Sequence, residues 1–356
     1  MATIACKQTY LPPIIKNPPT WLVVEGFINS GPDSTWFNLT HTYQLSSDST
    51  AGTPELGATV AVQGSDNTSY PLSQTGSTGL YTAHLPALDP NTRYRLYIST
   101  TSGNIYASDF VPLVNNPPID SINLIHSSAG ATIYTNTHDP SNSAHYFRWE
   151  YQETWEFTTY QADLKWTNNT LVLYNPDTTY ICWKADDNTN IILATSTQLA
   201  KDVIYEEPLV PIAQDAEKLG IEYSIYVLQY SLTDSAFNWW SIMQNNTANI
   251  GSIFGVQPIT DQGNLHCLTD TSQQVVGYVS AGTLRTQRVF FTNAQVQPWY
   301  YQPPCNIKEV GSGDLASWFE IGYLPIAPTN HGYNIAYADC VDCTLTGSNK
   351  KPYFWQ

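Results

Sequence analysis

Alternation of apolar and polar residues is the strongest pattern in the chain, and it predicts β-strands. The clearest strand covers residues 145–157, where aromatic residues recur with a period of two and share one face: Phe147, Trp149, Tyr151, Trp155 and Phe157. Segments rich in β-branched and aromatic residues predict further strands at 21–28, 35–45, 58–63, 80–85, 94–99, 104–110, 171–174, 180–184, 191–195, 222–232, 274–280 and 287–292.

Helical patterns are rare. An apolar stripe with 3/4 spacing runs from residue 236 to residue 243, after N-cap residues at 231–234, and predicts a helix that ends near Asn245. A shorter helix is predicted at 213–219, ending at Gly220.

Turn-rich and proline-rich segments divide the chain. The predicted fold is mainly β, with two tandem β-sandwich domains of immunoglobulin or fibronectin-III type, a short helical insertion in the second, and a cysteine-containing C-terminal tail. The tandem proline in Asn115-Asn116-Pro117-Pro118 marks the boundary between the domains. We therefore expect a truncated lipobox and Pro-rich tether at 1–20, an N-terminal β-sandwich at 21–114, a second β domain at 115–302, and a C-terminal segment at 303–356 packed on the body.

Composition narrows the class of partner. The 356 residues include 30 acidic and 14 basic ones, a net charge of −16, so a nucleic-acid partner, which needs a basic face, is excluded. Charged residues make up only 12% of the chain, and the polar surface is therefore mostly Thr, Ser, Asn, Gln and Tyr, which is typical of extracytoplasmic β proteins. The chain has no run of 18 apolar residues, so no membrane-spanning helix is predicted.

The first residues suggest a lipid anchor. Thr3-Ile4-Ala5-Cys6 is similar to a bacterial lipobox, in which small residues precede a cysteine that is acylated after signal cleavage. The charged and apolar parts of a signal peptide do not precede it, so we expect the chain to be truncated just before that point. Proline pairs between residues 9 and 21 predict an extended spacer that would hold a domain away from a membrane. Cys6 is therefore the predicted lipidation site, with outer-membrane lipid as its partner.

Five cysteines remain if Cys6 is lipidated. Cys340 and Cys343 form a C-x-x-C motif that would suit half of a zinc site, completed by Cys305 and a histidine such as His331. In an exported protein, a disulfide from Cys305 to Cys340 or to Cys343 is favoured instead. Cys182 and Cys267 are expected either to bridge within the second domain or to be buried thiols. No metal and no cofactor are expected.

No catalytic motif with a recognisable spacing is present, and one carboxylate stands out. Glu153 falls on the aromatic face of its strand, where an unpaired charge would cost several kcal/mol. It either pairs with a buried arginine, for which Arg285 and Arg288 are the candidates, or has a raised pKa and a function; a structural ion pair is favoured. Paired carboxylates for sugar hydrolysis stay open, because their separation is spatial and not sequential.

The abundant aromatic residues allow two interpretations. If exposed, they would form a platform on which sugars stack, and the first candidates are Trp36, Trp239, Trp240, Trp299, Tyr300 and Tyr301. The alternative, that they form the core, is favoured because the chain has few charged residues.

Several segments, in order, resemble a known family. They are Trp21-Leu22-Val23-Val24-Glu25-Gly26-Phe27-Ile28, Tyr106-Ala107-Ser108-Asp109-Phe110-Val111-Pro112, residues 146–157, Tyr230-Ser231-Leu232, Gly251-Ser252-Ile253-Phe254, Gln257-Pro258, and the tail from Cys340-Val341-Asp342-Cys343 to Pro352-Tyr353-Phe354-Trp355. Together they resemble the Bacteroidota lipoprotein family catalogued as domain of unknown function 4249. The resemblance implies an outer-membrane lipoprotein, often encoded beside a TonB-dependent receptor with a carboxypeptidase-regulatory-like domain. It carries over no catalytic residue.

The resemblance has one departure: Lys7-Gln8-Thr9 follows Cys6, without the acidic pair that often directs such lipoproteins to the cell surface. The expected function is a non-enzymatic, lipid-anchored partner of a TonB-dependent outer-membrane transporter that captures or gates a nutrient ligand, with the cell surface favoured over the periplasmic face. The alternatives are a self-sufficient glycan-binding or adhesive surface module and, third, a hydrolase with spatially assembled carboxylates.

Overall fold

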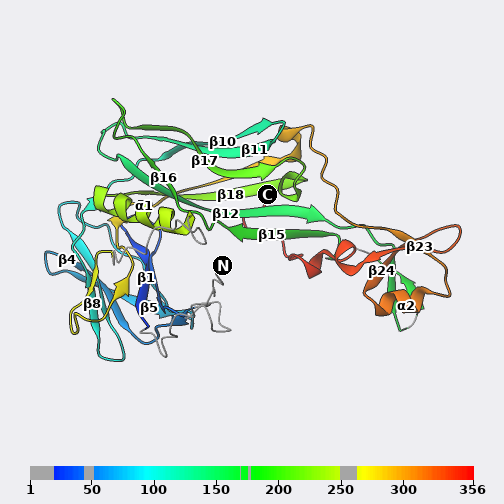
Figure 1. Cartoon of the computed structure of the whole chain (residues 1–356), viewed down its shortest axis with the longest axis horizontal. Helices are drawn as coiled ribbons and strands as arrows, with labels where there is room; N and C mark the ends of the chain where they lie inside the picture. Colours follow the sequence, from blue (N-terminus) through cyan, green and yellow to red (C-terminus); the bar gives the residue numbers. More distant parts are fainter. Residues whose placement is uncertain (1–19, 44–51, 169, 175–177, 249–262) are drawn as a thin grey trace, which may run out of the picture. The chain divides into compact units, whose positions relative to one another are not determined.

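The computed structural model describes residues 20–43, 52–168, 170–174, 178–248 and 263–356. The chain divides into two units: Met1–Leu113 with Pro258–Gly282, and Val114–Gln257 with Thr283–Gln356. Strands dominate both units (Figure 1). The mainly β class, with a helix and a cysteine-containing C-terminal segment in the second unit, is confirmed.

Unit 1 is built from short strands, most of them antiparallel. They are β1 (Leu22–Asn29), β2 (Thr35–His41), β3 (Thr53–Pro54), β4 (Thr59–Gly64), β5 (Ser69–Thr75), β6 (Leu80–Ala83), β7 (Tyr94–Ser99), β8 (Ile105–Ser108), β19 (Leu265–Cys267), β20 (Val275–Val276) and β21 (Ala281–Gly282), with β9 (Leu113–Val114) at the division. Strand β5 pairs with β4 along one half and with β6 along the other, so it connects the two layers of the sandwich. Phe37, Leu39, Val62 and Leu96 are fully buried between these layers.

The late strands of unit 1 differ from the sequence-based prediction. Residues 274–280 were expected to lie in the second domain, whereas β20 and β21 run parallel to β1, and β19 pairs with β8. Leu265 and Val275 are buried in the core of unit 1. Apolar alternation identifies a strand but not its partner, and this pairing joins residues about 250 positions apart in the sequence.

Unit 2 contains longer strands. They are β10 (Ile119–Ser127), β11 (Gly130–His138), β12 (Tyr146–Thr158), β13 (Leu164–Thr167), β14 (Thr170–Leu173), β15 (Ile181–Asp187), β16 (Ile192–Thr195), β17 (Val203–Ala213), β18 (Glu222–Ser231), β22 (Arg285–Thr292), β23 (Lys308–Val310), β24 (Tyr323–Pro328) and β25 (Tyr333–Tyr337). Its helical elements are η2 (Glu217–Leu219), α1 (Asp234–Ala248), η3 (Asn293–Val296), α2 (Leu315–Glu320), η4 (Ala338–Cys340) and η5 (Cys343–Leu345).

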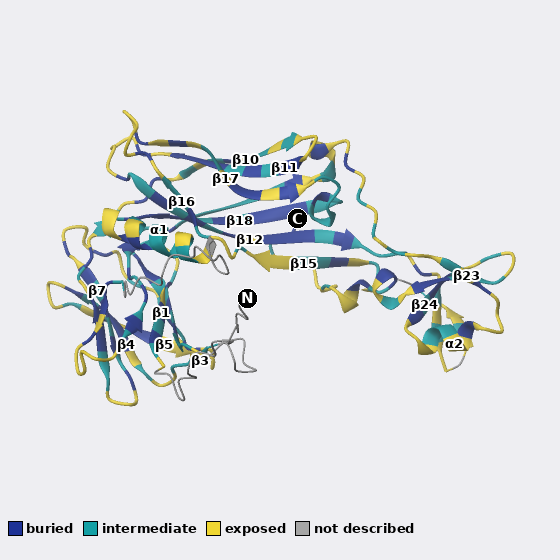
Figure 2. Ribbon diagram, in the orientation of Figure 1, coloured by how far each residue is buried: buried dark blue, intermediate teal, exposed yellow. Residues whose placement is uncertain are grey.

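Two sheets enclose the main core of unit 2. One sheet has the order β10-β11-β17, and the other has the order β15-β12-β18-β22 with β16 also paired to β12. Figure 2 shows buried residues along β12 and β18. The aromatic face predicted for β12 is confirmed, since Phe147, Trp149 and Phe157 lie in one buried cluster with Ile133 of β11 and Ile225 of β18.

The helices of unit 2 follow their predicted signals. Thr233 caps α1, because its hydroxyl accepts a hydrogen bond from the Ala236 amide at 3.2 Å. The shorter predicted helix is reduced to the 3₁₀ turn η2, which ends before Gly220. No helix in the described part of the chain is both long and apolar enough to span a bilayer.

The C-terminal segment is joined to the main sheet of unit 2. Its strands β23, β25 and β24 form a small sheet, beside the β13–β14 hairpin and α2. Farther along, Ser348 exchanges two backbone hydrogen bonds with Trp183 of the edge strand β15. Trp355 is buried against the rings of Trp183 and Phe290. The tail therefore covers part of a sheet edge that would otherwise offer unpaired backbone groups.

Candidate functional site

Two disulfides lie in unit 2. Cys305 pairs with Cys340, which confirms one of the two predicted alternatives, and Cys182 pairs with Cys343. Of the two alternatives for Cys182 and Cys267, the bridge is wrong, and the buried thiol is confirmed for Cys267, which lies in unit 1. The zinc interpretation is wrong too, since Cys340 and Cys343 belong to separate disulfides and their sulfurs are not thiolates. The tail is thus covalently joined to β15.

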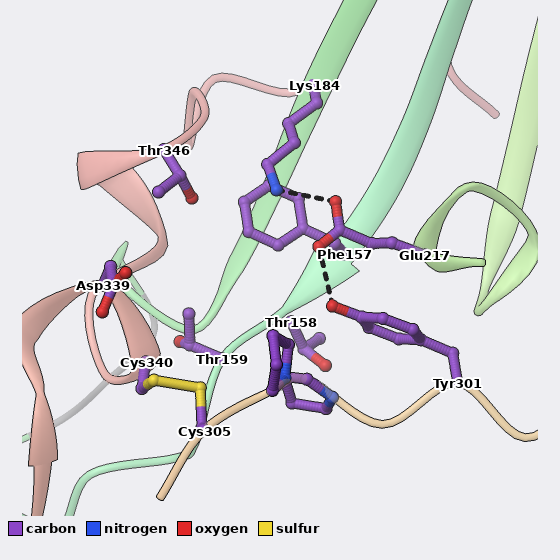
Figure 3. Close-up of a pocket in the computed structure, with 12 residues that line it drawn as sticks. Phe157, Thr158, Thr159, Lys184, Glu217, Tyr301, Cys305, Asp339, Cys340 and Thr346 are labelled. Atoms are coloured by element: carbon purple, nitrogen blue, oxygen red, sulfur yellow. Dashed lines mark hydrogen bonds and ion pairs between the residues drawn. A yellow bond between two sulfur atoms is a disulfide. The ribbon is translucent and has the colours of Figure 1, made fainter. Parts of the chain in front are cut away.

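A two-lobed pocket opens where β12 ends. The first lobe, of about 190 Å³, lies between Lys184, Glu217 and Tyr301 on one side and the Cys305–Cys340 disulfide on the other (Figure 3). The second lobe has about 250 Å³. The lobes are contiguous, because they share six lining residues: Phe157, Thr158, Thr159, Glu217, Tyr301 and Pro303.

Glu217 is the centre of the polar contacts in the first lobe. Its Oε1 accepts hydrogen bonds from Trp155 Nε1 at 2.9 Å and from Lys184 Nζ at 2.7 Å. Its Oε2 accepts a hydrogen bond from the Tyr301 hydroxyl at 2.9 Å. The Lys184 ammonium also lies 4.1 Å from the centre of the Phe157 ring (Figure 3). Strand register explains part of this, since Lys184 is directly opposite Trp155 and shares its face.

These contacts keep Glu217 ionised. Burial raises the pKa of the Glu217 carboxyl, but the hydrogen bonds from Lys184, Trp155 and Tyr301 outweigh it, and the pKa lies below its ordinary value. Burial, together with the hydrogen bond to Glu217, raises the pKa of the Tyr301 hydroxyl. Tyr301 therefore keeps its proton and donates it in the hydrogen bond to a charged carboxylate.

Neighbouring contacts place Tyr301 against Glu217. Trp299 is buried, and its Nε1 donates to the Ala216 carbonyl at 3.0 Å. The Tyr300 amide donates to Asp215 Oδ1 at 2.7 Å. Trp299 and Tyr300 are thus both bonded to the turn that precedes η2, and these bonds position the next residue, Tyr301.

Glu153 forms the predicted kind of ion pair, but with a different cation. Its carboxylate is 4% exposed and contacts Lys218 Nζ at 2.6 Å. It also accepts a hydrogen bond from the Tyr223 hydroxyl at 2.6 Å. Lys218 further lies 5.0 Å from the centre of the Trp155 ring, so Trp155 contacts both ion pairs of the site.

Strand register shows why neither predicted arginine pairs with Glu153. Glu153 lies opposite Ile225, which lies opposite Val289, so Arg288 is one residue away and on the other face. There its guanidinium stacks on the Phe354 ring at 3.6 Å. Arg285 lies four residues along β22, about 13 Å away at 3.3 Å per residue, and donates to the Asn116 carbonyl.

The aromatic candidates do not form a common platform. Trp239 and Trp299 are buried, and Trp36 lies in unit 1, half-buried. Trp240 is half-buried, with the Arg148 guanidinium 4.1 Å from its ring centre. Tyr300 is exposed, and Tyr301, next to it, lines the pocket. The core interpretation therefore holds for the buried tryptophans, while Tyr301 contributes to the site.

A second carboxylate, Glu156, lines the second lobe together with Glu217. Burial raises the pKa of Glu156, in contrast to Glu217. Alternation along β12 puts Glu156 on the face opposite to Trp155, whose indole bonds Glu217. Glu217, from η2, and Glu156 both line the second lobe, so the paired-carboxylate alternative stays a prediction.

Four predicted features lie outside the described residues. They are the lipidation site Cys6, the proline-rich spacer up to residue 19, the segment from Gly251 to Phe254, and Gln257-Pro258.

Comparison with known families now identifies the chain. The family model described as domain of unknown function (DUF4249) matches residues 7–288, more than three quarters of the chain. The chain belongs to the DUF4249 family. The match includes Glu153, Lys184 and Glu217, and it ends before Tyr301 and the Cys305–Cys340 disulfide.

Comparisons with curated sequences and with solved structures do not extend the assignment of this DUF4249 chain. No curated protein matches it by sequence. Among solved structures, a two-domain fibronectin type-III segment of chicken tenascin is similar over 59% of this chain and 90% of its own length, at 13% identity and a TM-score of 0.17.

Part of the DUF4249 site was not found from the sequence. Lys184 lies in a predicted strand and Glu217 in a predicted short helix, but no spacing connects them. The sequence held one signal for this site, the aromatic face of β12. The indole N–H of Trp155 on that face is buried and therefore needs a hydrogen-bond acceptor, which Glu217 provides.

Proposed function

We propose that this DUF4249 protein is an extracytoplasmic, lipid-anchored and non-enzymatic partner of a TonB-dependent outer-membrane transporter, and that it captures a small ligand. The pocket of unit 2 is the proposed capture site. Cys6, acylated, is the proposed anchor. The partner and the anchor rest on the sequence-based expectations described above.

The observation that carries the proposal is the pair of disulfides beside the pocket. Disulfides persist in oxidising compartments, which supports a location outside the cytoplasm. Cys305 and Cys340 line the first lobe, and the Cys182–Cys343 bridge joins the tail to β15, which carries Lys184. A cross-linked pocket wall favours binding, since a preformed site loses less conformational entropy when it holds a ligand.

The polar groups of the pocket also favour binding over catalysis. Glu217 is ionised and already accepts three hydrogen bonds, so it is a poor general base. The arrangement therefore supports a role in recognition, in which fixed donors and acceptors orient a ligand.

Fractionation of the native host tests the proposal. We expect the full-length protein in the outer membrane, with an acylated Cys6 in the mass spectrum of its N-terminal peptide, and a barrel protein retained on affinity purification in mild detergent. Cys6→Ala should release the protein from the membrane, whereas Cys267→Ala, which alters a buried thiol of unit 1, should not. A Cys6→Ala protein that stays in the membrane would refute the anchor, and purification without any barrel protein would refute the transporter partner.

A self-sufficient glycan-binding module is the second candidate. Tyr301, an aromatic residue in a pocket with polar groups, supports it. The two candidates differ in one outcome: the module would bind its ligand with no barrel protein attached.

A further inference from the structure

The size of the pocket limits what it can hold. A cavity of about 150 Å³ accommodates a benzene-sized ring. Lobes of about 190 Å³ and about 250 Å³ therefore each have room for one six-membered ring with its substituents. Because the lobes are contiguous, two linked rings would fit, and a folded protein domain would not.

The charges of the pocket disfavour an ionic ligand. Lys184 is paired with Glu217 at 2.7 Å, and Asp339 and Glu156 add further carboxyl groups to the first and second lobes. A carboxylate or phosphate ligand would meet this negative excess. A cationic ligand would meet Lys184, whose ammonium already occupies the position above the Phe157 ring.

After their bonds to one another, the polar side chains of the pocket still have hydrogen-bond donors and acceptors for a ligand. An ammonium carries three donors, and Lys184 uses one of them on Glu217. Glu217 Oε2 accepts only from Tyr301 among the described residues, so it retains lone-pair capacity. The Tyr301 hydroxyl donates to Glu217 and accepts no hydrogen bond from the described residues, so its oxygen can accept one from a ligand. Donors and acceptors within one small pocket suit vicinal hydroxyl groups, since each hydroxyl both donates and accepts.

Apolar surface lies next to these polar groups. Tyr301 and Pro303 line both lobes, so each lobe combines an aromatic ring and a proline ring with hydrogen-bonding groups. A ligand that fits has an apolar ring face and a polar rim. A pyranose ring has both, because its axial C–H bonds form apolar patches while its hydroxyls point outward.

We propose that the pocket binds a neutral pyranose ring, as a monosaccharide or the end of a saccharide. This inference rests on the capture role proposed above and names the class of ligand. Tyr301 contacts the ring, and Lys184 and Glu217 bond its hydroxyl groups.

The binding test uses the purified chain and four probes: methyl β-glucopyranoside, methyl β-galactopyranoside, methyl α-mannopyranoside and, as the anionic analogue, sodium glucuronate. Saturation-transfer NMR detects binding, and calorimetry measures the dissociation constant. We expect at least one neutral glycoside to bind with a Kd of about 1 mM, and glucuronate to bind at least about tenfold more weakly than glucoside. No signal from any neutral glycoside at about 20 mM, or tighter binding of glucuronate, would overturn the proposal.

Adjacent tyrosines provide a matched pair of variants. Tyr301→Ala removes a ring from the pocket and should weaken binding more than about tenfold. Tyr300→Ala removes a neighbouring ring that is 71% exposed, and it should leave binding unchanged. Equal losses in both variants would overturn the assignment. Tyr301→Phe and Lys184→Met keep most of the packing, and each should weaken binding by about three- to tenfold even if Tyr301→Ala is unstable.

The outcome separates the ligand class from the proposed function. Retention of a barrel protein without glycoside binding would reject the pyranose ligand and leave the transporter partner standing. Glycoside binding without any barrel protein would reject the transporter partner and leave the ligand class standing.

Discussion

Removing Lys218 should destabilise unit 2 by leaving a buried charge with one partner. The Glu153 carboxylate is 4% exposed and would keep only the hydrogen bond from Tyr223. Removing one member of a buried ion pair costs about 3–5 kcal/mol. Because the Lys218 side chain is 26% exposed, water can partly replace it, and we expect Lys218→Met to lower the free energy of unfolding by about 2 kcal/mol.

A double variant distinguishes charge from packing. Glu153→Gln combined with Lys218→Met removes both charges and keeps side chains of similar size, so its stability should lie within about 1 kcal/mol of the parent protein. Lys201→Met, at an exposed lysine, should be within about 0.5 kcal/mol.

Urea unfolding followed by tryptophan fluorescence measures these differences. All but two of the 11 tryptophans lie in unit 2, the exceptions being Trp21 and Trp36, so the signal reports mainly on the unit that contains the ion pair. If the double variant loses as much stability as Lys218→Met, packing and not charge is responsible. Equal stability of Lys218→Met and Lys201→Met would refute the importance of the pair altogether.

Two further variants test other parts of the chain. Cys343→Ser breaks the bridge to Cys182, which spans 161 residues, and should lower the free energy of unfolding by about 3–5 kcal/mol. Guanidinium unfolding without reductant measures this loss, and the control Cys267→Ala should lose only about 1 kcal/mol. Equal losses in the two variants would contradict the prediction. Burial raises the pKa of Glu207 to about 7 from its ordinary 4.5, so the native state keeps a proton that the unfolded chain releases, and stability falls as the pH rises through that interval. Glu207→Gln should therefore stabilise the protein by about 1 kcal/mol at about pH 8 and have little effect at about pH 4, as measured by Tm; a gain that is the same at both pH values, or equal in Glu206→Gln, would contradict it.

Local sequence patterns were sufficient for the central elements. The period-two aromatic face identified β12, and the cap at Thr233 with the apolar stripe after it identified α1. Both signals arise from neighbouring residues along one element, where burial on one side imposes the pattern. The need of Glu153 for a buried cation followed from the same pattern.

Long-range partners could not be obtained in this way. The cation for Glu153 comes from Lys218, in a turn 65 residues away, because strand register rotates Arg288 to the other face. The pocket was also out of reach, since Lys184, Glu217 and Tyr301 come from three separate segments. The disulfide partner of Cys182 depends on the path of the tail along β15, and the spacing of the cysteines in the sequence does not determine that path.

The late return of the chain to unit 1 has a consequence for biosynthesis. Strands β19, β20 and β21 complete a sandwich whose other strands were synthesised some 150 residues earlier. During synthesis from amino to carboxyl end, the first unit stays incomplete until Gly282 has emerged, and its hydrophobic interior is exposed in the meantime. A fragment cut at Leu113 would lack Leu265 and Val275 from its interior, so expressing the first unit alone requires grafting residues 263–282 onto it.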